Sequence, residues 1–342
     1  MQSLFSTLKQ LLFSAPVPAE PARQMSPGRR GKRPVHVRAD AARLSPAEID
    51  TAFYGLILGV QSALDTRPNK FESRVLRELD RLIVADISHS SLVPRLPAVI
   101  PRVMGTLRDQ DSSSAQLAAE LGRDAVLVSE VLRLSNSPYY RVGKEITSLE
   151  GAVFTLGRTG IRQLVINAAF KPLINLNAGY FTRLSGTLLW EQSEKTAVVC
   201  DCMAKEERVD RFHAYLMAVV QNVGLTVGLQ VLDRNFDGKD VPRSQQFRER
   251  LIRQSRVLSA KIARQWAFPD EVVEALEAQI DSSPDIERLP ALAAMLYFGD
   301  KLAKLHVLVS QGRIDGGALP RFRISRQRLT EYCSTCYQRL SA

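Results

Sequence analysis

The chain has 342 residues, of which 45% are hydrophobic, and a formal net charge of +10. This length and composition are typical of a folded protein with one large core or two modest ones. The longest apolar runs, such as Tyr215 to Val220, are far shorter than the roughly 20 residues of a membrane-spanning helix. We therefore predict no transmembrane segment and expect a cytoplasmic protein.

The N-terminal 44 residues differ in composition from the rest of the chain. Pro, Arg, Ala and Ser dominate after Ser14, which predicts a disordered leader over residues 1–44. The first 43 residues hold eight basic and two acidic side chains, which leaves only about +4 for the other residues. That remainder is too thinly spread to predict a specific nucleic-acid partner. A DNA-binding regulator that uses the basic leader stays open as an alternative.

Residues 1–13 place Leu4, Leu8, Leu11 and Leu12 on one helical face. This arrangement leaves open a weak contact with a membrane surface.

Order is expected to begin at Ser45, which forms a capping box with Glu48. Two helices are predicted, at residues 45–64 and 71–84, because apolar residues recur there at three- and four-residue spacing. They form an N-terminal two-helix module over residues 45–90. Two amphipathic helices alone bury little surface, so this module is a candidate surface for a homodimer or another partner.

Two prolines between Leu92 and Ala98 mark the start of the next domain. From there, caps and apolar spacing predict only helices. Their expected ranges are 113–122, 124–134, 147–157, one opened by Gly160, and then 188–205, 212–232, 248–266, 270–280, 289–305 and 327–340. The predicted fold is all-α, an irregular multi-helix bundle at residues 91–310 followed by a C-terminal extension at 311–342 that ends in a helix.

Four cysteines stand at positions 200, 202, 333 and 336, as a C-x-C and a C-x-x-C pair. A four-thiolate zinc site and a redox dithiol are two alternatives for such spacing. Both pairs lie in helical segments without Gly or Pro, whereas thiolate zinc sites usually sit on turns. We therefore expect reduced, partly buried thiols and no metal or other cofactor.

Several short segments resemble, in order and spacing, the HDOD family, a bacterial offshoot of the metal-dependent HD phosphohydrolases. The resemblance spans roughly residues 92 to 305 and implies a helical domain used in signal transduction. The residues that carry it are Leu96, Pro97, Asn136, Ser137, Pro138, Leu156, Gly157, Trp190 and Gly224.

The resemblance also shows where this chain departs from catalytic HD proteins, whose histidines and aspartates bind a divalent metal. The corresponding positions hold neutral amides, apart from one late aspartate. The five positions are Gln192, Gln221, Asn222, Gln279 and Asp300. Amides are poor substitutes for imidazole and carboxylate ligands, so we expect no metal and no hydrolysis by the HD route. The cleft stays polar and is a candidate ligand pocket.

These departures predict a non-enzymatic regulatory protein that acts by binding other signalling proteins. The resemblance implies a diguanylate cyclase or a receiver-type protein as the partner. Two alternatives stay open for the cleft. One is a sensor of a nucleotide or cyclic dinucleotide, and the other is a residual metal-dependent phosphohydrolase.

Overall fold

The computed structural model describes part of the unit Ala39–Ala342. The described residues are 43–60, 64, 66–101, 121–122, 125–137, 143, 145–281, 284–315, 319–320 and 340. The predicted leader up to residue 42, the predicted helix at 113–122 except its last two residues, and the predicted C-terminal helix except Leu340 lie outside this part.

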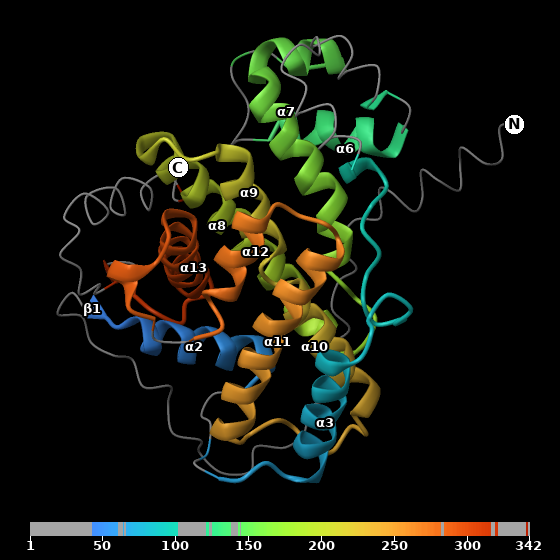
Figure 1. The fold of residues 1–342 in the computed structure, drawn as a ribbon, viewed down its shortest axis with the longest axis vertical. Coiled ribbons are helices and arrows are strands. Elements are labelled where there is room, and N and C mark those ends of the chain that lie inside the picture. The colour runs from blue at the N-terminus through green and yellow to red at the C-terminus, as the bar shows by residue number, and fades with distance from the viewer. Residues whose placement is uncertain are drawn as a thin grey trace, which may run out of the picture. The chain divides into compact units, whose positions relative to one another are not determined.

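The described part confirms the all-α prediction (Figure 1). Its α-helices are α2 (Pro46–Leu58), α3 (Lys70–Val84), α6 (Ala125–Ser135), α7 (Leu149–Ile174), α8 (Tyr180–Glu207), α9 (Arg211–Val220), α10 (Val223–Asn235), α11 (Gln245–Gln265), α12 (Asp270–Glu277) and α13 (Ala291–Ser310). A short 3₁₀ helix covers Ile286–Arg288. The two-residue strands β1 (Arg43–Leu44) and β2 (Leu319–Pro320) pair in parallel, so β1 occupies the last two residues of the predicted leader.

The predicted capping box at the start of α2 is present. The backbone N–H of Ser45 donates to Glu48 Oε2 at 2.8 Å, and the N–H of Glu48 donates to Ser45 Oγ at 3.3 Å. The helix ends earlier than residue 64 because Gly59, with φ 68°, adopts the left-handed conformation of a helix C-cap.

One predicted helix, 212–232, is in fact two. A turn at Gln221–Asn222 separates α9 from α10. Ser259 of α11 stabilises this turn, because its hydroxyl donates to the Gln221 carbonyl at 2.6 Å and accepts from the Gly224 N–H at 2.9 Å. The hydroxyl thus satisfies backbone groups that a continuous helix would have paired internally.

Arg211–Asn235 is the one segment of the described chain that is long and apolar enough to cross a membrane, but 89% of its apolar window is buried inside the protein. This burial is what a core helix of a globular domain requires.

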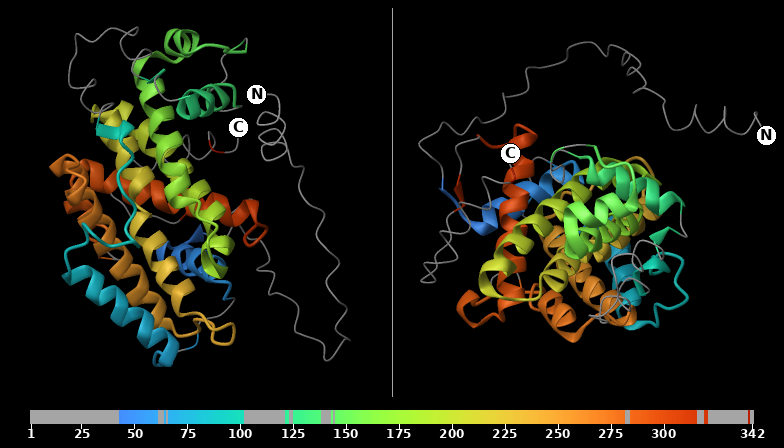
Figure 2. Two further views of the ribbon diagram at one scale, coloured as in Figure 1. Left: turned by 90° about the vertical axis from the view of Figure 1, so that its right-hand side faces the viewer. Right: turned by 90° about the horizontal axis from the view of Figure 1, so that it is seen from above.

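The buried apolar side chains form two clusters. The large cluster joins α2, α3 and α8 to α13 with the second half of α7. The small cluster joins α6 to α7, and these helices lie at the top of Figure 1 and of the left view of Figure 2. Gly157 kinks α7 there with φ 67° and ψ 177°, at the position where the sequence predicts a helix end.

The N-terminal helices do not pack as a separate pair. α2 packs against α8 and α13, whereas α3 packs against α10 and α11. Residues of both helices therefore belong to the large cluster. The domain limits at residues 44, 90 and 310 stay predictions.

Asn136 follows the last residue of α6 and ties this helix end down through its side chain, while its backbone φ is not positive. Its side-chain Nδ2 donates to the Leu132 and Ile146 carbonyls at 3.0 and 2.7 Å, and its Oδ1 accepts from the Ile146 N–H at 2.8 Å. Asn136 thus ties the end of α6 to the start of α7.

The other motif residues have packing roles. Trp190 is buried, Leu96 packs against the large cluster and Leu156 packs against the small one. Ser137 follows Asn136 at the end of α6, and its N–H donates to the Leu134 carbonyl at 2.9 Å. Pro138 lies outside the described residues.

Gly224 lets α10 and α11 approach closely, since an added Cβ would lie 2.0 Å from the Ser255 carbonyl oxygen and 2.5 Å from the Ser259 nitrogen. We predict that Gly224→Ala lowers the free energy of unfolding by about 1–3 kcal/mol, because backbone atoms must move. Gly228→Ala on the same helix is the control, since a Cβ there meets only side-chain atoms, at 3.0 and 3.3 Å. Equal urea midpoints for the two variants would contradict this prediction.

Candidate functional site

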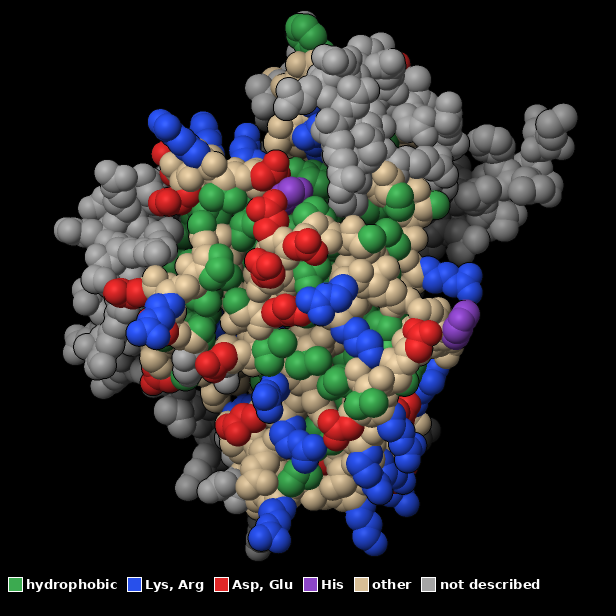
Figure 3. All heavy atoms as spheres, in the orientation of Figure 1, with side chains coloured by type: hydrophobic (Ala, Val, Ile, Leu, Met, Phe, Trp, Pro, Cys, Tyr) green, Lys and Arg blue, Asp and Glu red, His purple; other side chains and the backbone are tan. Residues whose placement is uncertain are grey.

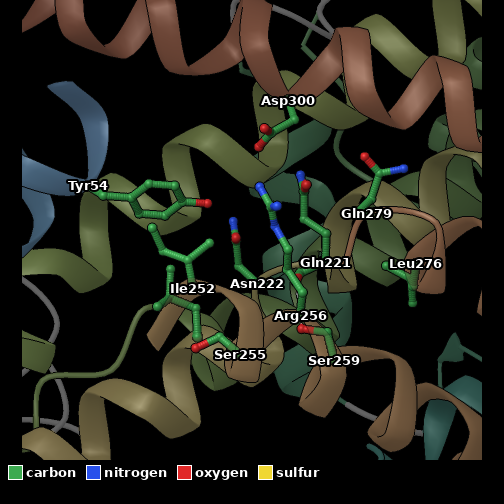
Figure 4. A pocket seen from close by; sticks show the side chains of 11 residues that line it. Tyr54, Gln221, Asn222, Ile252, Ser255, Arg256, Ser259, Leu276, Gln279 and Asp300 are labelled. Carbon is green, nitrogen blue, oxygen red and sulfur yellow. Dashed lines mark hydrogen bonds between the residues drawn. The ribbon is translucent and has the colours of Figure 1, made fainter. Parts of the chain in front are cut away.

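The structure brings all five predicted site residues together. Gln221, Asn222, Gln279 and Asp300 line one pocket (Figure 4). They come from the α9–α10 turn, the residues after α12 and the middle of α13. Gln192 of α8 is fully buried behind the pocket, where it contacts Asp300 and Asn222.

A chain of amides starts at Asp300. Gln192 Nε2 donates to Asp300 Oδ1 at 2.8 Å, and Gln192 Oε1 accepts from Asn222 Nδ2. Asn222 Nδ2 also donates to Ser193 Oγ at 3.0 Å. Because a carboxylate only accepts hydrogen bonds, Asp300 determines the orientation of the Gln192 amide, which in turn orients Asn222.

The other two amides bond to nearby backbone. Gln221 Nε2 donates to the Ala218 carbonyl at 3.2 Å. Gln279 Nε2 donates to the carbonyls of Ala275 and Ala293 at 3.1 and 3.0 Å, which joins the end of α12 to α13. These contacts satisfy buried polar groups where helices meet.

Two buried lysines that the sequence reasoning missed neutralise the site. Lys304 Nζ lies 2.8 Å from Asp300 Oδ2 and 2.8 Å from Asp50 Oδ1. Lys301 Nζ lies 3.0 Å from Asp300 Oδ2 and 2.6 Å from Asp50 Oδ2. The two lysine side chains are only 2% and 1% exposed, so each ammonium group is held between carboxylates of α2 and α13 and away from solvent.

Tyr54 and Arg256 also line the pocket and contact these charged groups (Figure 4). The Tyr54 hydroxyl accepts from Lys304 Nζ at 2.9 Å, and an Arg256 terminal nitrogen lies 3.7 Å from Asp50 Oδ2. We call Asp50, Arg256, Asp300, Lys301 and Lys304 the charge cluster. Its three cations and two carboxylates carry a net charge of about +1 at neutral pH.

A signal for the lysines was present in the sequence. Lys301 and Lys304 interrupt an otherwise apolar helix at one and four positions after Asp300. Charged residues on a buried helix face are rarely left unpaired. The third partner, Asp50, is 251 residues from Lys301 in the chain, a separation over which spacing carries no information.

The charge cluster shifts the pKa of its members. Burial alone would raise the pKa of the Asp50 and Asp300 carboxyls, but attraction to the two lysines, and for Asp50 also to Arg256, outweighs it and holds both pKa values below the ordinary range. Burial would lower the pKa of Lys304, yet the two carboxylates raise it above its usual value. All three groups therefore stay charged at neutral pH.

These residues do not fit a catalytic metal. Asp300 Oδ1 accepts from Gln192 and Oδ2 from both lysines, so both oxygens of the one retained acid already have partners within the protein. Amides bind transition metals weakly, and two ammonium groups repel a cation. Over the described ranges, no three His, Cys, Asp or Glu side chains come together as a metal-binding group.

The first cysteine pair is placed within α8. Cys200 is buried, its Sγ donates to the Met295 carbonyl at 3.5 Å, and burial raises the pKa of its thiol. Cys202 is half-buried. The second pair, at 333 and 336, lies outside the described residues.

The pocket is small. Its volume of about 30 Å³ suffices for about two water molecules. Leu225, Ile252 and Leu276 form its apolar wall. A nucleotide therefore requires displacement of surrounding side chains before it fits.

Removing one of the buried ammonium groups should destabilise the fold, because the carboxylates then remain buried with fewer counterions. We predict that Lys304→Met lowers the free energy of unfolding by about 3–5 kcal/mol, because Asp50 and Asp300 lose a buried partner. The exposed Lys205→Met serves as a control and should change it by less than about 0.5 kcal/mol. In urea titrations, the double variant Asp300→Asn/Lys304→Met should lose less free energy of unfolding than the two single variants lose in sum. Additive costs would argue against this pairing.

The depressed carboxyl pKa values predict a loss of stability in acid. Their contribution is complete above the unfolded pKa of about 3.9 and disappears as the pH falls through the lower folded values. We expect a constant urea midpoint from pH 8 to 6 and a steep fall below about pH 4. The Asp300→Asn variant should lose less of its own neutral-pH stability over the same range, and a parallel fall in both proteins would refute the assignment.

Comparisons with known proteins agree with this fold. The HDOD domain model matches residues 93–282, and no curated protein matches. A Geobacter sulfurreducens HDOD domain protein of unknown function is 22% identical, with 79% of this chain and 89% of that one covered and a TM-score of 0.53. A Marinobacter aquaeolei protein provisionally assigned to signal transduction is 20% identical, with 82% and 67% covered and a TM-score of 0.54.

A Shewanella amazonensis protein provisionally assigned as a metal-dependent phosphohydrolase is 18% identical, with 80% of this chain and 100% of that one covered and a TM-score of 0.51. At these identities the solved structures establish a shared helical fold. The family match covers more than half of the chain and confirms the resemblance carried by the sequence motifs. This chain therefore belongs to the HDOD domain family.

Proposed function

We propose that this HDOD protein is a non-enzymatic bacterial regulator that acts in the cytoplasm by binding other proteins. The observation that carries the proposal is that Gln192, Lys301 and Lys304 contact both carboxylate oxygens of Asp300. The one metal-ligand side chain that survives at the HD position is thereby used inside the fold, and recognition by the outer surface is the function that remains.

The chemistry of the ammonium groups supports this proposal. Lys301 and Lys304 supply two positive charges to Asp50 and Asp300. An ammonium group donates hydrogen bonds, but it has no open coordination position at which a water could be bound and made more acidic. The cluster therefore gives the fold electrostatic balance without a means to generate a nucleophile.

Signalling proteins are the partners proposed from the family resemblance, with a diguanylate cyclase or a receiver-type protein as the first candidates. The Marinobacter aquaeolei protein with the same fold carries a signal-transduction assignment of its own. The small volume of the pocket favours protein binding over the alternative of a nucleotide sensor in the cleft.

An activity assay tests the non-enzymatic part. We expect protein purified without chelators to contain far less than one iron, manganese or zinc per chain, and to release no product from bis-p-nitrophenyl phosphate or cyclic dinucleotides when manganese or iron is added. The physical reason is that both Asp300 oxygens already bond to Gln192 and the two lysines. Stoichiometric metal together with turnover that Asp300→Asn abolishes would revive the residual phosphohydrolase.

A binding assay tests the regulatory part. The full chain, used as bait in extracts of its native cell, should retain a defined signalling protein. The purified pair should then form a complex of measurable stoichiometry whose affinity is unchanged by added nucleotides. Binding that requires a nucleotide, and calorimetric heat that disappears in a Gln221→Ala and Asn222→Ala double variant, would instead favour the sensor.

A further inference from the structure

The exposed side of α3 carries a straight row of basic side chains. Lys70, Arg74, Arg77 and Arg81 are all exposed and follow one another at spacings of four, three and four residues. This spacing places them on one face of the helix, along about 16 Å of its axis. The opposite face is buried, so α3 is held firmly with this row directed to solvent.

Neighbouring segments add further cations. α3 packs beside α11, on which Arg250 and Arg253 are exposed, and the loops next to α3 expose Arg67 and Arg243. Figure 3 shows Lys and Arg side chains gathered over the lower part of the view, where Figure 1 places α3. We call the row and these four arginines the basic face.

The cations of the row are not neutralised internally. Within the described part of the chain, no carboxylate forms an ion pair with any member of the row. The nearby acids have other partners. Asp80 lies 3.4 Å from Arg250, and Glu78 accepts from Asn235 at 2.9 Å. The basic face therefore presents a net positive charge, although the chain outside the leader carries only about +4 in all.

The composition of the basic face indicates the kind of partner. Protein interfaces place aromatic anchors at their centre, with Met and Arg also enriched, but none of the exposed aromatic side chains of the described residues lies on α3 or α11. Nucleic-acid interfaces are polar and strongly cationic, and guanidinium groups bind phosphate through paired hydrogen bonds. The lack of an aromatic stacking platform disfavours single strands.

We propose that the basic face binds the phosphate backbone of double-stranded DNA without sequence selection. The rigid row on α3 supplies contacts to successive phosphates, and the arginines of α11 and the loops contact the flanking ones. Such binding requires no base recognition, in keeping with the expectation that the chain has no specific nucleic-acid target. It is independent of the proposed regulatory function and of the charge cluster.

The test uses the full chain, a fluorescein-labelled 30-base-pair duplex of arbitrary sequence, and fluorescence anisotropy at 50 to 200 mM salt. The test variant is Arg74→Gln/Arg77→Gln/Arg81→Gln. The matched control is Arg183→Gln/Lys205→Gln/Arg288→Gln, which removes the same charge from exposed sites on α8 and the 3₁₀ helix. The leader is present in every protein, so its contribution to binding is common to all.

Each lost phosphate contact should make the slope of log affinity against log salt shallower by about 0.9. The slope of the triple variant should therefore be shallower by about 2.7. Between 50 and 200 mM salt, the affinity of the unsubstituted chain should then fall about 40-fold more than that of the variant. The control variant should retain nearly the full slope. The charge-retaining Arg74→Lys/Arg77→Lys/Arg81→Lys variant should also retain it, which separates charge from folding.

Three outcomes would overturn the proposal. The first is an equal loss of slope in the control variant, which would indicate a general charge effect. The second is duplex binding that the α3 substitutions leave unchanged. The third is that the α3 substitutions weaken binding only to phosphatidylserine vesicles or to polyglutamate, which are tested in parallel. That result would assign the basic face to a membrane or to an acidic protein. Circular dichroism and urea midpoints verify that each variant is folded.

Discussion

The contact between Asp300 and the ammonium group of Lys304 is the interaction on which the rest of the site depends. A carboxylate buried at this depth is stable only when it is paired and fully hydrogen-bonded. Lys304 and Lys301 pair with Asp300 Oδ2, and Gln192 donates a hydrogen bond to Oδ1. The charge of Asp300 is thereby balanced within the protein itself.

This balance links helices that are distant in sequence. Asp50 on α2 meets the lysines of α13, while the amides of Gln192 and Asn222 connect α8 to the α9–α10 turn. The same turn is held to α11 by Ser259. Directional polar contacts therefore fix how five helix segments meet, whereas the apolar cluster around them is less selective about orientation.

Much of the fold could be predicted from local sequence signals. The capping box at Ser45, the kink at Gly157 and the helical character of the chain follow from short-range chemistry that spacing reveals. The break between α9 and α10 was not predicted, because apolar residues continue on both sides of Gln221–Asn222 and the turn depends on Ser259 in another helix. Long-range partners decide such boundaries.

The candidate site was predicted only in part, because some of its residues are brought together by contacts between distant segments. The five amide and acid positions followed from the family resemblance, and the structure places them together. Asp50, Tyr54 and Arg256 come from α2 and α11, whose proximity to α13 no local pattern encodes. The lysines could have been identified, because charged residues within an apolar helix call for partners.

The position of the two lysines on α13 has a consequence for how the site assembles. Asp300-Lys301-Leu-Ala-Lys304 is a contiguous five-residue string, so little more than one turn of α13 carries the acid together with both lysine counterions. Each ammonium group held at this carboxylate repels any further cation that approaches it. The pairing of Asp300 with Lys304 is therefore set by the one-turn spacing within a single helix and needs no other segment of the fold.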